Sequence, residues 1–206
     1  MKVKTLFLIC FLSITCLLNA ADKPVIQIHT DNSSLIFRVA DNGRLYQSYL
    51  GKKLSHETDI SHLPQGTEAY ITHGMEDYFE PAIHILHNDG NPSLLLKYVS
   101  HETKAVSQGV NETIITLGGD KYPVTVKLHY VTYPAEDIIK TYTEISHKEK
   151  KPVVLHQYAS SMLHLNRAKY YLTEFAGDWA HEANISDQPL EFGKKVLDTK
   201  LGARAN

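Results

Sequence analysis

The sequence predicts an all-β protein built as a large antiparallel β-sandwich. Two observations lead to this fold class. Short segments of alternating polarity recur along most of the chain, and turns rich in Gly, Asn, Asp and Pro separate them. No amphipathic helix longer than two turns is visible in the pattern. Strands at this spacing are typical of sandwiches rather than of alternating α/β folds.

The segments expected to be strands follow one another from residue 35 to residue 175. In chain order they are 35–39, 45–50, 82–86, 94–99, 112–117, 122–133, 138–146, 153–158, 162–165 and 169–175. The alternation is clearest in 122–133, where one face is apolar and the other polar. The apolar face carries Val124, Val126, Leu128 and Tyr130, and the polar face carries Thr125, Lys127 and His129.

The turns between these segments predict their connections. The turn at Asn42-Gly43 is expected to join the first two strands as a hairpin, with both residues at positive φ. The turn 88–92 is expected to join the third and fourth strands in the same way. The last segment, 190–206, lacks strand rhythm. The pattern therefore predicts a sandwich that is incomplete at its C-terminal end.

The first 20 residues have the pattern of a cleaved signal peptide. Two lysines precede an apolar run, 6–18, and the small residue Ala20 follows at the usual cleavage distance. A membrane anchor is the alternative, but the run is shorter than the roughly 20 residues that span a bilayer. We therefore expect export to the periplasm or the medium, and a mature domain of residues 21–206.

The composition of the mature chain excludes several classes of function. Cys10 and Cys16 both lie in the signal segment, so no disulfide, thiolate metal site or cysteine nucleophile is expected after cleavage. Removing the two lysines of the signal leaves 19 basic and 23 acidic residues, a net charge of −4. No basic stripe is present, and a nucleic-acid partner is not expected. A (β/α)₈ barrel needs about 250 residues, which excludes a sandwich and a barrel together.

One loop stands out as a candidate binding element. Residues Gly74-Met75-Glu76-Asp77-Tyr78-Phe79-Glu80-Pro81-Ala82 place a carboxylate beside an aromatic ring, between a glycine and a proline. Glycine permits positive φ and proline fixes φ ahead of the next strand, so both ends of the loop are constrained. Such loops carry many of the side chains that contact ligands.

This loop resembles the Gly-x-x-Asp-(Phe or Tyr)-Arg-x-Pro-Ala loop in the N-terminal domain of family 36 glycoside hydrolases, the α-galactosidases. A second match lies at Gly177-Asp178-Trp179-Ala180-His181-Glu182, similar to the Gly-x-Trp-x-x-Glu segment of that domain. The resemblance covers roughly residues 26–206. Phe79 stands where the family usually carries Arg, so the contact made by that Arg is lost or altered here.

The resemblance implies a fold, a function and partners. The fold would be a supersandwich of the galactose-mutarotase-like type. The chain would be the accessory and structural N-terminal domain of an enzyme that hydrolyses terminal α-linked galactose. The catalytic barrel, which supplies an Asp nucleophile and an Asp acid/base in this family, would be absent, and no catalytic residue, metal or cofactor is expected in this chain. Partners would be an α-galactoside, the barrel or like subunits.

Three residues are the candidate sugar contacts: Asp77, Tyr78 and Trp179. Asp77 could reach a sugar or a neighbouring subunit's active site, or it could cap its own loop as an Asx turn. Tyr78 could stack on a sugar or fill the core. Trp179 is the sole tryptophan; its indole could form a stacking platform, although its place in the Gly-x-Trp-x-x-Glu segment favours packing.

Twelve histidines suggest a different class of function. His84 and His87 are three apart on a strand and should face opposite sides, which is wrong for one metal. His129, His147 and His156 lie on separate strands and could converge with His164. Sandwiches of this type also occur in aldose 1-epimerases, which use a His and a Glu. A mutarotase-like epimerase and a stand-alone carbohydrate-binding module are therefore the alternative functions.

Overall fold

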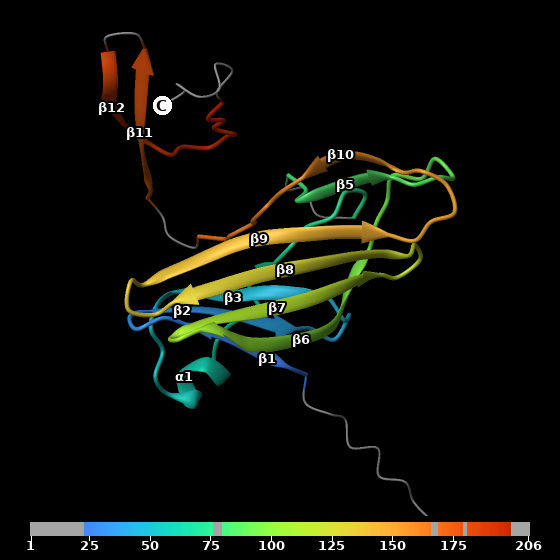
Figure 1. The fold of residues 1–206 in the computed structure, drawn as a ribbon, viewed down its shortest axis with the longest axis horizontal. Helices are drawn as coiled ribbons and strands as arrows, with labels where there is room; N and C mark the ends of the chain where they lie inside the picture. The colour runs from blue at the N-terminus through green and yellow to red at the C-terminus, as the bar shows by residue number, and fades with distance from the viewer. Residues whose placement is uncertain (1–22, 76–79, 166–168, 179–180, 199–206) are drawn as a thin grey trace, which may run out of the picture. The chain divides into compact units, whose positions relative to one another are not determined.

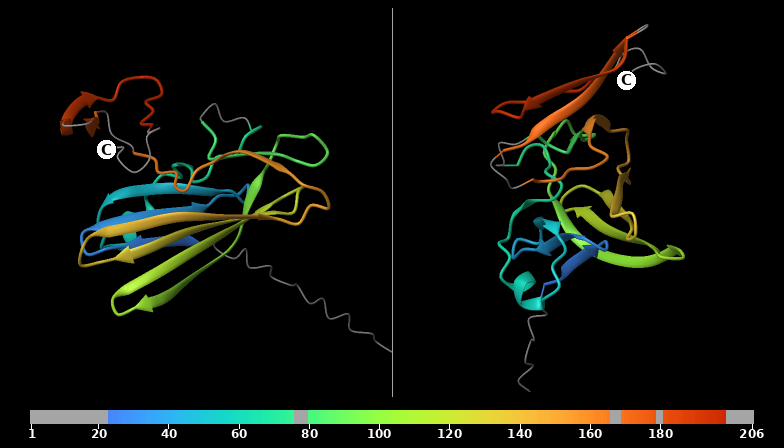
Figure 2. Two further views of the ribbon diagram at one scale, coloured as in Figure 1. Left: turned by 45° about the horizontal axis from the view of Figure 1, so that its top comes forward. Right: turned by 90° about the vertical axis from the view of Figure 1, so that its left-hand side faces the viewer.

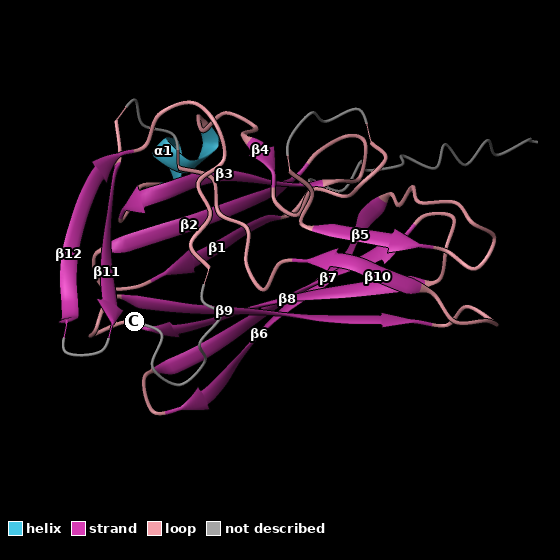
Figure 3. Cartoon of the chain, turned by 90° about the horizontal axis from the view of Figure 1, so that it is seen from above, coloured by secondary structure: helices cyan, strands magenta, loops and turns pink. Residues whose placement is uncertain are grey.

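The computed structural model describes residues 23–75, 80–165, 169–178 and 181–198. The chain divides into two compact units, Met1–Met162 and Leu163–Asn206, and each is described by itself. Among the described residues, no helix is long and apolar enough to span a membrane. Figure 3 shows that strands dominate and that the described helix is short.

The described residues of the first unit form two four-stranded antiparallel sheets, a two-stranded sheet and one short helix. The first sheet consists of β1 (Val25–His29), β2 (Ser33–Val39), β3 (Leu45–Lys52) and β4 (Thr67–Glu68), in that order. The second consists of β6 (Leu96–Ser107), β7 (Val110–Gly119), β8 (Val124–Tyr133) and β9 (Ile138–His147). The small sheet pairs β5 (Ile83–Leu86) with β10 (Val154–Tyr158), and the helix is α1 (Glu57–Ser61).

The two large sheets face each other across one hydrophobic core (Figures 1 and 2). Phe37 of β2 contacts Tyr130 of β8 across this core, with ring centroids 5.2 Å apart. All four residues predicted for the apolar face of β8 are buried there. The small sheet closes one side, because Ile83 and Ile85 of β5 join the same core. The predicted all-β sandwich is confirmed.

The hairpin between β2 and β3 is confirmed, with one difference in the turn. Gly43 has a φ angle of +77°, but Asn42 does not take a positive φ. The Asn42 side chain instead accepts a hydrogen bond from the Arg44 N–H at 2.9 Å, and the Gly43 N–H donates to the Ala40 carbonyl at 2.9 Å. A three-residue loop with one left-handed glycine needs no second positive φ.

The predicted pairing of 82–86 with 94–99 is wrong, because β5 and β6 belong to different sheets. Hydrogen bonds within residues 87–91 fix the turn between these two strands. The His87 N–H donates to the Asn91 carbonyl at 2.9 Å, and the Asn91 N–H donates to Asp89 Oδ1 at 3.0 Å. Pro92 then removes the next backbone donor. The chain leaves this turn toward the second sheet, and β5 pairs with β10 instead.

The strand expected at 162–165 is also absent, since these residues form no ladder. Conversely, the sequence pattern missed β1, the outer half of β6 and β12 (His181–Pro189), which pairs with β11 (Tyr171–Asp178) in the second unit. The outer half of β6 is exposed on both faces and therefore has no alternation to detect.

The turn after β8 meets the turn between β1 and β2. Asp137 has a φ angle of +57° and accepts hydrogen bonds from the hydroxyl of Thr30 and, at 3.1 Å, from that of Ser33. The Asp31 N–H also donates to the Pro134 carbonyl at 3.2 Å. These bonds form a polar clip that joins the two large sheets at one end.

Candidate functional site

The loop that carries the acid–aromatic motif is tightly constrained at its start. Gly74 has a φ angle of +82°, which glycine adopts without strain. A Cβ atom here would lie 2.4 Å from Ser93 Oγ and 2.8 Å from Ser93 Cα, which is too close. Both conformation and space therefore require glycine. Asp77 and Tyr78, the predicted contact residues, lie outside the described residues.

Backbone hydrogen bonds bring the two ends of this loop together. The His73 N–H donates to the Ile83 carbonyl at 3.0 Å. The Ala82 N–H donates to the Ile71 carbonyl at 2.7 Å. On the other side, the Leu94 N–H donates to the His73 carbonyl at 3.2 Å. Backbone hydrogen bonds therefore join the segment before the loop to the segment after it. A rigid base of this kind is typical of loops that present binding residues.

Strand β10 holds the C-terminal end of the loop. Gln157 Nε2 donates to the Pro81 carbonyl at 2.7 Å and to Glu80 Oε1 at 3.3 Å. The Ala159 N–H, just after β10, donates to the Ala82 carbonyl at 2.7 Å. The loop's exit is thus attached to a strand that lies about seventy residues further along the chain.

Three histidines gather at the base of the same loop. The rings of His73 and His84 stack with centroids 3.7 Å apart and an interplanar angle of 10°. The His156 ring lies 4.9 Å from that of His84. Burial lowers the pKa of His84, and the positive charges that His73 and His156 can carry lower it further. We call these three residues the histidine cluster.

Among the described residues, no ring contact joins any two of His129, His147 and His156, which were expected to converge. His156 joins the histidine cluster, but with His73 and His84 rather than with His129. His84 and His87 have separate neighbours, as their spacing predicts. Among the described residues, no group of three His, Cys, Asp or Glu side chains is arranged to hold a metal ion.

A second polar cluster lies on the face of the β6–β9 sheet opposite the core. Glu112 of β7 is buried, with His129 Nδ1 2.9 Å and the Tyr142 hydroxyl 2.6 Å from its Oε1. Lys104 Nζ is 3.0 Å from its Oε2. The bonds from Tyr142, His129 and Lys104 lower the pKa of Glu112 to about 2. We call these four residues the carboxylate cluster.

The other members of this cluster are fixed by the same carboxylate. The bond to Glu112 and the adjacent charge raise the pKa of Tyr142 to about 12. The rings of Tyr142 and His129 stack with centroids 4.2 Å apart. His129 Nε2 is buried without a hydrogen-bond partner and lies 3.6 Å from Glu144 Oε2. Within the cluster, the Glu112 carboxylate is therefore shielded from solvent, whereas Lys104 is exposed.

A second His–Glu pair is buried at the end of the small sheet. His87 Nδ1 lies 2.7 Å from Glu149 Oε1, and the two side chains are 0% and 2% exposed. The His87 ring stacks on Tyr122 with centroids 3.5 Å apart. The Asn88 N–H donates to Glu149 Oε2 at 3.1 Å. These contacts join the β5–β6, β7–β8 and β9–β10 turns, and the Glu149 carboxylate is shielded from solvent.

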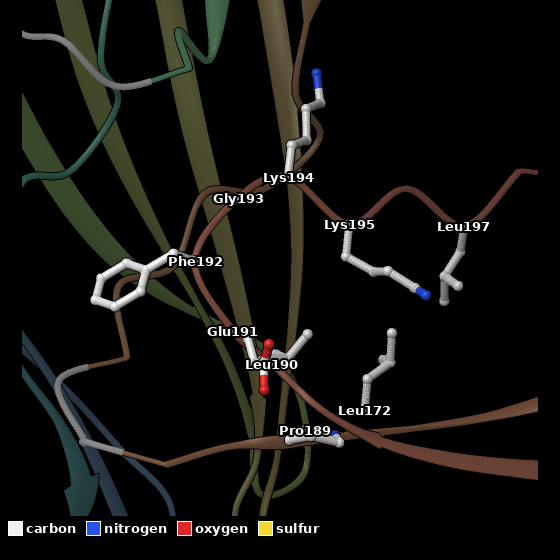
Figure 4. A pocket seen from close by; sticks show the side chains of 9 residues that line it. All are labelled: Leu172, Pro189, Leu190, Glu191, Phe192, Gly193, Lys194, Lys195 and Leu197. Atoms are coloured by element: carbon white, nitrogen blue, oxygen red, sulfur yellow. The ribbon is translucent and has the colours of Figure 1, made fainter.

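The second unit contains the region of the second sequence motif. Trp179 lies outside the described residues. Phe175 and Ile185 pair across β11 and β12 and are both exposed, and Thr173 donates to Asp187 at 2.9 Å. Figure 4 shows an open hollow in this unit. Its lining residues are Leu172, Pro189, Leu190, Glu191, Phe192, Gly193, Lys194, Lys195 and Leu197.

Sequence reasoning missed both the histidine cluster and the carboxylate cluster. Glu112 and His129 face the same side because the observed register pairs even positions of β7 with odd positions of β8, such as Ile114 with His129. The polar alternation of 122–133 placed His129 on the outer face, and this was the only signal available. For His84 and His156, the required signal is the pairing of β5 with β10, which local pattern does not contain.

Comparisons with known proteins agree with the fold. Among solved structures, the α-galactosidase AgaA from Geobacillus stearothermophilus is 19% identical with a TM-score of 0.74. The galactosidase domain of the α-galactosidase–sucrose kinase AgaSK is 20% identical with a TM-score of 0.73. The α-galactosidase from Lactobacillus brevis is 17% identical with a TM-score of 0.66. Each match covers 82% of this chain and 28% of the solved chain.

No curated protein matches the chain. The family model of the glycosyl hydrolase family 36 N-terminal domain matches residues 42–206, which include the loop at Gly74–Pro81 and both strands of the second unit. That match covers well over half of the chain. The chain therefore belongs to the family of the glycosyl hydrolase family 36 N-terminal domain.

Proposed function

We propose that this chain serves as the accessory and structural N-terminal domain of an α-galactosidase-like hydrolase that removes terminal α-linked galactose. The observation that carries the proposal is the family match over residues 42–206. Because the chain spans 28% of the solved α-galactosidase chains, the rest of such an enzyme would have to come from further sequence or from another chain. We expect the catalytic barrel or like subunits to be its partners.

The proposed ligand is an α-galactoside, bound weakly or through the intact enzyme. Variants of AgaA have been solved with raffinose and with stachyose. In this chain the proposed contacts are Asp77 and Tyr78 of the loop, together with Trp179. The anchored loop base supports the first two, because Gly74 and Gln157 constrain both ends of the segment that carries them.

Catalysis by this chain alone is not part of the proposal. Retaining glycosidases need two carboxyl groups about 5–5.5 Å apart, one of them able to donate a proton. Glu112 has a pKa of about 2 and accepts three bonds, which makes it a poor acid or base near neutral pH. Glu149 is buried against His87. The two shortest His–Glu contacts of the described residues are therefore unsuited to a mutarotase-like epimerase, which needs an accessible His and Glu.

We also propose that the chain is exported. Residues 1–20 carry the signal-peptide pattern, and the mature protein would start at Ala21 or Asp22. Intact mass of the secreted product tests this directly. A product that still contains the apolar run 6–18 would contradict it.

The test of the main proposal separates binding from hydrolysis. The purified chain should not hydrolyse a chromogenic α-galactoside, and it should bind raffinose weakly in ligand-observed NMR. Asp77→Asn and Trp179→Ala should each reduce that binding, whereas Asp31→Asn, a matched change at an exposed position, should not. Turnover that depends on an Asp or Glu of this chain would contradict the proposal. Strong binding by the chain alone would favour the stand-alone binding module.

A further inference from the structure

The turn between β9 and β10 carries three exposed lysines and one carboxylate. Lys148, Lys150 and Lys151 are exposed, and Glu149 lies between them in the sequence. From the sequence alone, this turn has mixed charge. In the structure it leaves the right-hand end of β9 in Figure 1 and connects to the small sheet.

Glu149 points inward and is removed from the surface of this turn. Its side chain is 2% exposed, and it accepts bonds from His87 and from both the backbone and the side chain of Asn88. Burial raises the pKa of Glu149, but these bonds lower it more, and the carboxylate keeps its charge. The lysines on either side therefore face solvent without an ion pair to Glu149, whose charge lies beneath the surface.

The neighbouring turn adds a fourth lysine to the same surface. The Lys148 N–H donates to the Pro123 carbonyl at 2.9 Å, which places the β9–β10 turn beside the β7–β8 turn. Lys121 in that turn is exposed, and its Nζ lies 5.5 Å from the centre of the Tyr122 ring. We call Lys121, Lys148, Lys150 and Lys151 the lysine patch.

Two carboxylates lie near the patch, and neither forms an ion pair with a lysine of the β9–β10 turn. Asp120 pairs with Lys97 at 2.7 Å. Asp89 accepts a hydrogen bond from the Tyr122 hydroxyl at 2.9 Å, and it also interacts electrostatically with Lys121. Within the described part of the chain, no carboxylate lies within ion-pair distance of the three lysines of the β9–β10 turn. An acidic chain thus presents a local cationic surface.

We propose that the lysine patch binds an acidic polysaccharide, one that carries carboxylates along its chain. The choice of a polysaccharide rests on the proposed function in a carbohydrate-active enzyme; the choice of an acidic one rests on charge complementarity. Each lysine carries one charge on a flexible side chain and lacks the planar, bidentate guanidinium of arginine. Flexible side chains of this kind can follow the irregularly placed carboxylates of a flexible polymer. Binding between exposed charges is screened by salt.

The probe is polygalacturonate, compared with neutral galactan, and binding is measured by affinity electrophoresis of the full chain. We expect retardation by polygalacturonate at low salt, its loss at high salt and none by galactan. The triple variant Lys148→Ala, Lys150→Ala, Lys151→Ala should weaken binding at least tenfold, because each surface lysine contributes about fivefold near an anionic surface. Its melting temperature is measured alongside to show that it is folded.

The matched control removes three exposed lysines elsewhere, in Lys52→Ala, Lys53→Ala, Lys169→Ala. This variant has the same net charge and should bind like the unmodified chain. Equal losses in both variants, or equal retardation by galactan, would overturn the proposal, as would binding to anionic lipid vesicles but not to polygalacturonate. Raffinose binding by the same samples tests the proposed function separately, since it does not involve these lysines.

Discussion

The histidine cluster and the carboxylate cluster of the first unit use the same residue type under opposite conditions. In the carboxylate cluster, His129 lies against Glu112, which also accepts a hydrogen bond from Tyr142 and forms an ion pair with Lys104. In the histidine cluster, His84 lies between two other imidazoles, and the described residues place no carboxylate in an ion pair with any of the three. His129 is thus held by a charged acceptor, whereas His84 has imidazole neighbours and a lowered pKa.

The largest expected effect is on the carboxylate cluster. Glu112→Gln keeps the shape of the side chain but removes the charge that three partners share, and we expect a loss of about 2 kcal/mol in the free energy of unfolding. Urea denaturation at pH 7 measures this. Glu144→Gln is the control, because that side chain is 57% exposed and should change stability by less than about 0.5 kcal/mol. Similar losses in both variants would mean that Glu112 is not the centre of the cluster.

A smaller effect is expected where β10 holds the loop beside the histidine cluster. Gln157→Leu removes the donor to the Pro81 carbonyl, and we expect a loss of about 1 kcal/mol together with faster amide exchange at Ala82. Gln108→Leu changes an exposed glutamine in the β6–β7 turn and should have almost no effect on either quantity. Unchanged exchange at Ala82 in the Gln157 variant would show that the loop exit is held by its backbone bonds alone.

The smallest expected effect is the pH response of the histidine cluster. The pKa of His84 is lower in the fold than in the unfolded chain, where it is near 6.5. The unfolded state therefore binds more protons below that value, and stability should fall slightly between pH 7 and pH 5, because solvent screens this partly exposed group. Glu112 cannot cause this fall, because its contribution is lost only between about pH 4.5 and pH 2.

His84→Gln should reduce this fall, measured by urea denaturation at both pH values. The part due to His29, whose pKa burial also lowers, should remain. His147→Gln, a change at an exposed position on β9, should leave the slope as it is. An unaltered slope in the His84 variant would place the acid sensitivity elsewhere and would remove the functional contrast between the two clusters.

The local sequence pattern predicts where most strands lie, but it does not predict which strands pair with each other. The apolar positions of β8 were predicted because alternation reports which face is buried. The false hairpin at 88–92 arose because a turn signal shows where a chain bends and not which strand it meets next. β12 and the exposed half of β6 lack alternation, and pattern reasoning cannot detect such strands.

The same limit applies to the candidate site. The loop at Gly74 was found because its residue types are unusual together, and the fold confirms the need for glycine. The histidine cluster depends on β5 meeting β10, a pairing that connects segments about seventy residues apart. The roles of Asp77, Tyr78 and Trp179 stay predictions, since these residues lie outside the described part of the chain.

The polar clip at Asp137 has a consequence for the rate at which this fold is lost. Its bonds join Thr30 and Ser33 to a residue 107 and 104 positions away. Such contacts close a long loop, and we expect these to form after the folding transition state. Contacts absent from the folding transition state slow unfolding without speeding folding. Asp137→Ala should therefore accelerate unfolding in stopped-flow urea jumps and leave the refolding rate unchanged. The clip would act as a kinetic lock on the sandwich.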